Sequence, residues 1–279
     1  MEVNPCAKIN LGLNVVSKRS DGYHNLETVF YPVRLYDQLT VEPLPLDHVG
    51  QSSCQLTVDG LDILGDVQDN LVVKAYHLLN EHRPLPPVKV HLSKRIPTQA
   101  GMGGGSADCA YMLTALNTLF SLGLSKAELM HLAAQLGADC AFFIEPQPAY
   151  AEGIGNQLQP LPLNIDSYYM AIVKPPVAVS TKEAFANIQV HCPEKNCKDI
   201  VLQPIETWRN ELINDFELSV IPQYPVIGQI KQQLYGLGAV YAAMSGSGSA
   251  LFALFSNKPC QLQKTFSDCA TYVIPPVKR

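Results

Sequence analysis

Charged side chains are scarce in this 279-residue chain, at 16% of the residues, and they leave a formal net charge of -5. Such a chain has no basic field to attract nucleic acid and no block of like charges that would indicate a disordered tail. No apolar run approaches the roughly 18 residues of a membrane-spanning helix. Near the N-terminus, Glu2 and Asn4-Pro5 stand where a leader peptide has basic residues and then an apolar run. We therefore expect a cytoplasmic protein that binds neither nucleic acid nor membranes.

Cysteine pairing is also missing. The chain has eight cysteines, but no Cys-x-x-Cys and no Cys/His cluster at the spacing of zinc ligands. The two nearest in sequence, Cys192 and Cys197, stand alone, and this isolated spacing favours neither a disulfide nor a metal site. We predict reduced thiols and no metal centre built by the protein.

Mixed β and α patterns predict an α+β fold. Period-2 alternation from Lys8 to Val16 predicts a half-buried strand with Lys8 and Asn10 on its polar face. Further strands are expected at 27–33, 39–43, 88–96, 168–173 and 251–255, and helices at 70–83, 107–119, 125–136, 226–235 and 258–269. Because the elements interleave without a steady βαβ rhythm, an α+β sandwich is favoured over a doubly wound sheet. A proline-rich stretch and the turn at 153–156 predict two domains, residues 1–155 and 156–279.

A glycine-dense loop from Pro97 to Ala107 joins a predicted strand to a predicted helix. Its glycines allow positive φ angles and a close approach of the main chain to a ligand. The loop amides and the positive end of the next helix, with Ser106 as the expected N-cap, would form an anion site. The Gly-Lys-Ser/Thr of a Walker A loop is missing, and the spacing of a dinucleotide fingerprint fails. A flexible turn with close helix packing is the alternative.

A second loop of small residues, Met244 to Ser249, precedes the apolar segment 250–255. Alone, such a loop is most often an ordinary linker. Beside a strand, and with a matching first loop, it is predicted to form a wall of the phosphate site.

Asp139 is a single carboxylate in the apolar segment 136–143. Burying an acid is costly unless something compensates for it, and one interpretation is a helix N-cap. The functional interpretation pairs Asp139 with Lys8, although a lone lysine is more often solvated. Together they would supply a carboxylate that accepts a hydroxyl proton and an ammonium that stabilises the alkoxide and the transferred phosphoryl group.

Five motifs, in this order, make the chain resemble the GHMP kinases, the group of galactokinase, homoserine kinase and mevalonate kinase. They are Ala7-Lys8-Ile9-Asn10-Leu11, Asp21-Gly22-Tyr23-His24, Pro97 to Ala107, Gly137-Ala138-Asp139 and Ser245-Gly246-Ser247-Gly248. The Asp-Gly-Tyr-His motif and Asp69-Asn70-Leu71 are most similar to the members that phosphorylate a cytidyl-diphosphate polyol in the non-mevalonate isoprenoid pathway. The resemblance implies a ribosomal-protein-S5-like α/β sandwich followed by a C-terminal ferredoxin-like α+β domain.

The same resemblance implies a small-molecule kinase, a monomer or homodimer, with ATP beneath the glycine loop and Mg²⁺ arriving with ATP. Asp139 would be the general base and Lys8 its electrostatic partner. The implied ATP-binding residues are Asn70, Leu71, Lys94, Pro97, Gly101, Gly103, Gly104, Gly105, Ser106, Ser247 and Gly248. The implied substrate-binding residues are Asn10, Tyr23, His24, Thr181 and Phe185, of which Tyr23 and Phe185 would stack on cytosine and His24 would hydrogen-bond to it. Without the resemblance, Tyr23 and His24 are turn residues and Phe185 is an ordinary apolar one.

Two positions depart from the family pattern. Gln99-Ala100 replaces a pair of small residues or glycines, and Cys140-Ala141 replaces a frequent Val-Pro, which leaves the orientation of Asp139 open. Three alternatives follow: a homoserine- or mevalonate-type kinase, a non-catalytic nucleotide-binding module, and an RNA-binding sandwich. Tyr23 with His24 argues against the first, Lys8 with Asp139 against the second, and the acidic charge against the third.

Overall fold

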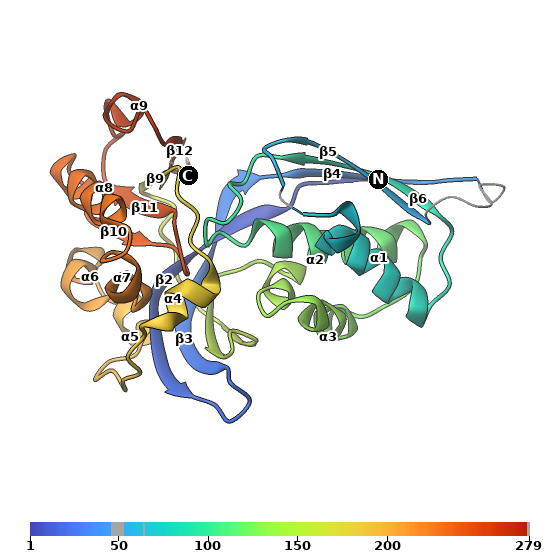
Figure 1. Cartoon of the computed structure of the whole chain (residues 1–279), viewed down its shortest axis with the longest axis horizontal. Helices are drawn as coiled ribbons and strands as arrows, with labels where there is room; N and C mark the ends of the chain where they lie inside the picture. The colour runs from blue at the N-terminus through green and yellow to red at the C-terminus, as the bar shows by residue number, and fades with distance from the viewer. Residues whose placement is uncertain (46–52, 64, 278–279) are drawn as a thin grey trace. The chain divides into compact units, whose positions relative to one another are not determined.

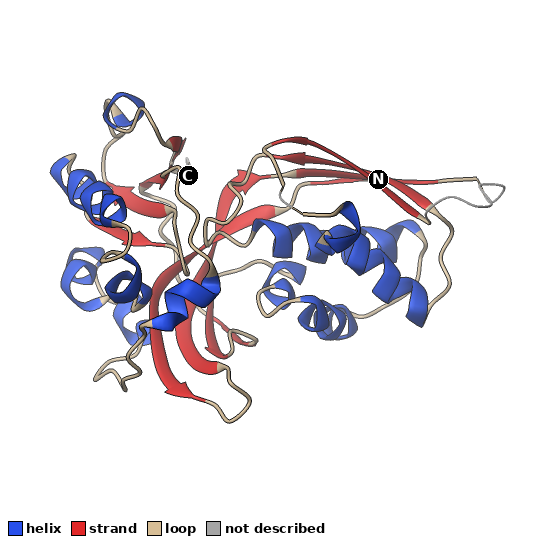
Figure 2. Ribbon diagram, viewed as in Figure 1, coloured by secondary structure: helices blue, strands red, loops and turns tan. Residues whose placement is uncertain are grey.

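The computed structural model describes residues 1–45, 53–63 and 65–277. Strands and helices are mixed along the chain (Figure 2), which confirms the α+β prediction. The strands are β1 (Glu2–Val3), β2 (Cys6–Lys18), β3 (His24–Tyr36), β4 (Gln38–Pro43), β5 (Cys54–Gly60), β6 (Val88–Lys94), β7 (Ala149–Gly153), β8 (Gln157–Pro160), β9 (Tyr169–Lys174), β10 (Tyr241–Met244), β11 (Leu251–Phe255) and β12 (Ala270–Ile274). The α-helices are α1 (Leu71–His82), α2 (Gly104–Leu119), α3 (Lys126–Leu136), α4 (Thr181–Ala186), α5 (Cys197–Val201), α6 (Ile205–Glu211), α7 (Phe216–Val220), α8 (Pro225–Gly236) and α9 (Leu262–Thr265), and the 3₁₀ turns are η1 (Val67–Asp69) and η2 (Cys140–Ile144).

The chain forms two compact units whose segments interleave in sequence. Unit 1 contains Met1–Ala7, Val33–Thr98 and Gly103–Pro146, and unit 2 contains Lys8–Pro32, Gln99–Met102 and Gln147–Arg279. The glycine loop therefore contributes residues to both units. Because these units are defined by spatial contacts, the division into domains at residue 155 stays a prediction about the sequence.

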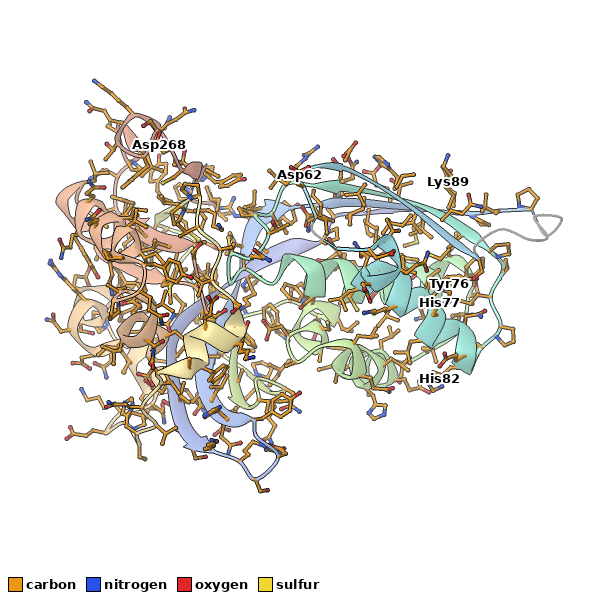
Figure 3. The ribbon with its side chains drawn as sticks, in the orientation of Figure 1. Asp62, Tyr76, His77, His82, Lys89 and Asp268 are labelled. Atoms are coloured by element: carbon orange, nitrogen blue, oxygen red, sulfur yellow. The ribbon has the colours of Figure 1, made fainter. Side chains whose placement is uncertain are left out.

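Unit 1 is built on a four-stranded sheet in the order β1-β4-β6-β5. Strand β5 runs parallel to β6, and α1 forms the crossover that a parallel pair needs. The helices α1, α2 and α3 lie along one side of this sheet (Figure 1). They share a buried core with β4 and β6, in which Tyr76, labelled in Figure 3, is fully buried and donates its hydroxyl to the carbonyl of Pro86 at 3.1 Å.

Two helices of unit 1 begin where their capping residues stand. Asn70 caps α1 by accepting the N–H of Val72 at 2.9 Å. Ser125 and Glu128 form the predicted capping box of α3, which ends at Gly137. These ends confirm the predicted helices.

The prediction of Ser106 as an N-cap is wrong. Helix α2 begins three residues earlier than expected, with Gly103 at the N-cap in a left-handed conformation of φ 70° and no side-chain cap. A glycine tolerates this φ without strain, so the glycines themselves start the helix and Ser106 lies in its first turn.

Unit 2 contains two antiparallel sheets, in the orders β2-β3-β7-β8 and β10-β11-β9-β12. In chain order, the second sheet and its helices follow a β-α-β-β-α-β plan, which is the ferredoxin-like arrangement that the resemblance implied. Its core joins β9, β10 and β11 to α7 and α8.

The helix predicted over 258–269 is mostly wrong, because only Leu262–Thr265 is α-helical. Its N-cap, Gln261, has φ 64° and offers no side-chain cap, so the helical spacing upstream of it does not propagate into a longer helix. None of the helices in the described residues is long and apolar enough to cross a membrane.

Candidate active site

The two glycine loops meet within unit 2. Gly101 has φ +69°, and a Cβ there would lie 1.9 Å from the carbonyl oxygen of Ser245. The Ser245 hydroxyl donates to the Gly101 carbonyl at 2.8 Å, and the Ala250 N–H donates to the Ala100 carbonyl at 3.3 Å. Only glycine fits at position 101, so the second loop is packed against the first, as the sequence predicted.

Lys8 and Asn10 form a buried polar pair on β2. Lys8 is 3% exposed, donates its Nζ to Asn10 Oδ1 at 2.5 Å and lies 4.9 Å from the centroid of the Phe30 ring. Asn10 in turn donates Nδ2 to the Thr28 hydroxyl at 3.0 Å, and its backbone N–H donates to Ser245 Oγ at 3.3 Å. A buried ammonium acts at low dielectric, where its field is strong, and here it is tied to the second glycine loop through Asn10 and Ser245.

An aromatic pair lies near the start of β3. The rings of His24 and Phe185 are stacked, with centroids 4.8 Å apart and planes 17° apart, and Phe185 also meets the Phe216 ring edge-on at 4.8 Å. On the same helix as Phe185, the Thr181 hydroxyl lies 3.5 Å from Ser247 Oγ. Unit 2 thus brings together four of the predicted residues, namely His24, Thr181, Phe185 and Ser247.

Tyr23 belongs to an exposed turn. Its backbone N–H donates to Asp21 Oδ1 at 3.1 Å, its carbonyl accepts the Arg19 N–H at 2.8 Å, and its residue is 63% exposed. Gly22, with φ +86°, allows this turn to close. The turn therefore fixes the backbone of Tyr23 and leaves the ring accessible.

The start of α2 in unit 1 is packed so that it requires glycine. A Cβ on Gly104 would lie 3.1 Å from Ile96 Cγ2 and 3.2 Å from Lys94 Nζ, and one on Gly105 would lie 3.9 Å from Leu71 Cδ1. The first N–H groups of a helix have no partner inside the helix, and with the helix dipole they attract anions. The predicted phosphate residues Gly103 to Ser106 occupy this position.

Lys94 lies under this helix start as the centre of a buried ion cluster with Asp37 and Asp108. Its Nζ donates to Asp37 Oδ2, and to Asp108 Oδ2 at 2.8 Å, and all three residues are at most 3% exposed. Burial would lower the pKa of Lys94, but Asp108 and Asp37 together raise it. Burial also raises the pKa of Asp108 to about 7, against the opposing effect of Lys94. The predicted contact of Lys94 with ATP stays a prediction, since its ammonium is held by two carboxylates.

Asp139 precedes η2 and is linked to the phosphate helix through its neighbour. It takes the N-cap position of η2, but its side chain makes no capping hydrogen bond, which argues against the structural interpretation. A hydrogen bond with the Cys109 thiol lowers the pKa of the next residue, Cys140, burial opposes this, and a hydrogen bond with Ser106 lowers it further. Because Ser106 and Cys109 belong to α2, unit 1 holds Asp139 next to the helix that carries the predicted phosphate residues.

A pocket of about 250 Å³ lies at the end of β5, where Figure 3 labels Asp62. Its walls are largely apolar and also include three aspartates and the predicted residue Asn70. The lining residues are Leu56, Val58, Asp59, Gly60, Leu61, Asp62, Ile63, Gly65, Asp66, Val67 and Asn70. Apart from Asn70, sequence reasoning missed these residues, because no periodic pattern marks the loop after β5.

The donors fit a magnesium ion that is carried mainly by a nucleotide. Within the described residues, no group of three His, Cys, Asp or Glu side chains could hold a metal. Unit 1 does offer the Ser106 hydroxyl and the Asp139 carboxylate, which are hard oxygen donors of the kind that Mg²⁺ prefers.

Comparisons with known proteins agree over the whole chain. The family profile described as GHMP kinases N terminal domain matches residues 70–145, and that described as GHMP kinases C terminal matches residues 201–260. The chain is 54% identical over 252 residues to a 4-diphosphocytidyl-2-C-methyl-D-erythritol kinase of Bacteroides fragilis, covering 90% of this chain and 91% of that protein. It is 47% identical to the enzyme of the same name from Parabacteroides distasonis, covering 95% and 96%. A solved structure of a 4-(cytidine 5'-diphospho)-2C-methyl-D-erythritol kinase matches with a TM-score of 0.82 at 30% identity, covering 99% of this chain and 100% of the other.

Proposed function

The chain belongs to the GHMP kinase family, and from this we propose that it transfers the γ-phosphoryl group of ATP to the 2-hydroxyl group of 4-diphosphocytidyl-2-C-methyl-D-erythritol. This reaction belongs to the non-mevalonate route to isoprenoids. The observation that carries the choice of alcohol is the ring pair of His24 and Phe185. Such a pair suits a substrate with a planar base, whereas homoserine and mevalonate have no ring to stack.

We propose that Asp139 accepts the proton of the attacking hydroxyl. Loss of the proton to a carboxylate lets the oxygen attack the phosphorus in line with the leaving ADP. The buried Lys8 ammonium stabilises the negative charge that develops on the attacking oxygen and on the transferred group. Asn10, which accepts a hydrogen bond from Lys8, holds that ammonium in place and helps to bind the methylerythritol end.

The nucleotide is proposed to lie along the glycine loop. The pocket at the end of β5 takes the adenine, with Asn70, Leu71 and Lys94 at its border. The phosphates bind the amides of Gly103 to Ser106 and of Ser247 and Gly248, while Pro97 and Gly101 shape the loop. Mg²⁺ bound with ATP neutralises phosphate charge, and Ser106 and Asp139 are the side chains that would hold it.

The cytosine is proposed to stack on Phe185 and Tyr23 and to hydrogen-bond to His24. In the structure His24 itself lies on Phe185, with 4.8 Å between the ring centroids. A planar base needs its own stacking distance on each side, so the two rings must separate when the base enters between them. Thr181, on the helix of Phe185, completes the proposed substrate site. We also propose a cytoplasmic enzyme that acts as a monomer or homodimer.

A coupled assay of ADP release tests this function. Purified protein is given ATP and Mg²⁺ with the cytidyl-methylerythritol substrate, with homoserine or with mevalonate. We expect turnover with the first compound only. Turnover with either of the other two alone would reject the proposed acceptor, and ATP binding without turnover on any of the three would favour a non-catalytic module.

A further inference from the structure

Asn214 holds the second glycine loop through both of its side-chain functions. It is fully buried, and its Nδ2 donates to the carbonyls of Met244 at 2.8 Å and Gly246 at 2.9 Å. Its Oδ1 accepts the N–H of Phe216 at 3.0 Å. One side chain therefore fixes two carbonyls of a loop that lies 30 or more residues further along the chain.

The segment around Asn214 is itself anchored on β2, the strand of Lys8 and Asn10. Leu13 donates its N–H to the Ile213 carbonyl at 2.9 Å and accepts the N–H of Asp215 at 2.8 Å. The N–H of Val15 donates to Asp215 Oδ2 at 2.7 Å. The donor of Asn214 thus starts from a rigid strand and not from a free loop.

A carboxylate on the same segment fixes the base of the loop from its other polar side. Glu217 Oε1 accepts the N–H of Met244 at 2.8 Å, and its Oε2 accepts a hydrogen bond from Lys231. At the other end of the bend, Ser245 Oγ joins the loop to Gly101 and to Asn10. The loop is therefore fixed on several sides, and Asn214 is the contact that reaches its bend.

Peptide geometry links this contact to the nucleotide. A trans peptide is planar and its C=O and N–H point in opposite directions. Because the Gly246 carbonyl is directed at Asn214, the N–H of the next residue, Ser247, is turned to the opposite side of the loop. Ser247 is one of the residues proposed to bind the phosphates of ATP.

We propose that Asn214 is a positioning residue for ATP, which orients the second glycine loop so that the Ser247 amide faces the phosphates. This inference rests on the proposed function only for the identity of the ligand as ATP. If it holds, loss of the Asn214 donor weakens nucleotide binding and leaves the affinity for the alcohol unchanged.

Three substitutions grade the loss of the donor. Asn214→Asp keeps the shape and the acceptor for Phe216, but it places a carboxylate oxygen against two carbonyl oxygens. Asn214→Ala removes the contact, and Asn214→Ser keeps a single shorter donor, which protects the test if the first two variants fold poorly. Asn117→Ala is the matched control, because Asn117 also uses its amide on backbone groups, donating to the Leu124 carbonyl at 3.1 Å and accepting the Leu124 N–H at 3.0 Å.

The readouts are the Kd of a non-hydrolysable ATP analogue by calorimetry, the KM of each substrate and the melting temperature. We expect the nucleotide Kd to rise about tenfold in Asn214→Ala and more in Asn214→Asp, with the KM of the cytidyl substrate within about twofold, since a lost hydrogen bond to a charged group costs about that much. Asn117→Ala should lower the melting temperature without this split. An unchanged nucleotide Kd in any folded Asn214 variant, or an equal rise in both KM values, would overturn the inference. Wild-type protein that binds the analogue but leaves the cytidyl substrate unphosphorylated would refute the proposed function alone.

Discussion

At the scale of single residues, the chemistry depends on a carboxylate that the local fold leaves without a capping role. The side chain of Asp139 makes no capping hydrogen bond to η2, although the residue stands at its N-cap. In Asp139→Asn the amide cannot accept a proton, so we expect kcat to fall at least about 10²-fold, the contribution typical of a general base. Steady-state kinetics with the cytidyl substrate check this, and the ATP analogue should still bind within about threefold.

A separate control excludes damage to α2. Ser106 and Cys140 are hydrogen-bonded, so Cys140→Val, which restores the residue frequent in the family, changes the support of Asp139 without removing its carboxylate. A kcat near that of the wild type in Asp139→Asn would remove Asp139 from the role of base. A comparable loss in Cys140→Val would show that the surroundings of Asp139 limit the rate.

The ring residues give a second prediction at this scale. Tyr23 is 63% exposed, and His24 is stacked on Phe185, so both can reach a base without being needed by the core. We expect Tyr23→Ala and His24→Ala each to raise the KM of the cytidyl substrate at least about fivefold, since the loss of one stacking contact costs about 1 kcal/mol. The KM of ATP, measured in the same assay, should stay within about twofold. Equal effects on the two KM values would place these rings outside the base site.

At the scale of elements, the contact between the glycine loops sets a packing limit that can be measured. Gly101 and Gly123 both have φ +69°, but a Cβ would lie 1.9 Å from Ser245 O at Gly101 and within 4 Å of nothing at Gly123. Gly123→Ala therefore reports the backbone strain alone, roughly 1–2 kcal/mol. We expect Gly101→Ala to lose more stability, by a further 1 kcal/mol or more, together with most of its activity.

Urea unfolding followed by far-ultraviolet circular dichroism compares the two alanine variants. The difference between them isolates the close approach of the loops, because the φ angles match. If the two variants were equally stable and equally active, the loops would not need to pack this closely for either folding or catalysis.

The sequence predicted the elements that carry their own signals. The alternation in 8–16 gave β2, the capping box at Ser125 gave α3, and the glycine-rich junction located the start of α2 to within a turn. The short helices α4 to α7 were missed, because helices of five to seven residues are held by tertiary contacts and have too few turns for a periodic pattern. The Lys94 cluster was missed for a related reason: Asp37, Lys94 and Asp108 are far apart in sequence, and nothing local pairs them.

The candidate site divides along the same line. Motif order identified Lys8, Asp139 and both loops, and the structure confirms that Gly101 packs on the second loop. Sequence reasoning could not find Asn214, because a buried asparagine becomes informative only when its partners, two carbonyls 30 and 32 residues away, are known.

At the scale of the whole molecule, the two units draw on segments that are separated in sequence, with 8–32 and 99–102 joining 147–279. A linear reading predicts a boundary where proline and glycine gather, but it has no means to assign an early strand to a late unit. Stability therefore depends on long-range contacts, and the buried cluster of unit 1 is one whose effect on the whole chain can be titrated.

Asp108 should make the stability of the protein depend on pH. Burial raises the pKa of Asp108 to about 7, so between about pH 4 and pH 7 the native protein keeps a proton that the unfolded chain has lost. The free energy of unfolding therefore falls as the pH rises through this range and levels off above it. Asp108→Asn resembles the protonated acid at every pH, so its stability relative to the wild type should increase by roughly 1–3 kcal/mol from pH 5 to pH 8.

Chemical unfolding at several pH values, followed by circular dichroism, measures this difference. Dichroism is the better probe, because the single tryptophan, Trp208, lies in unit 2 and Asp108 lies in unit 1. The control is Asp69→Asn, whose side chain is 76% exposed and pairs with Lys74 at the surface, so its curve should run parallel to that of the wild type. If Asp108→Asn also ran parallel to the wild type, Asp108 would be ionised throughout this range. The cluster would then hold two carboxylates and one ammonium at a cost that other contacts of the fold must offset.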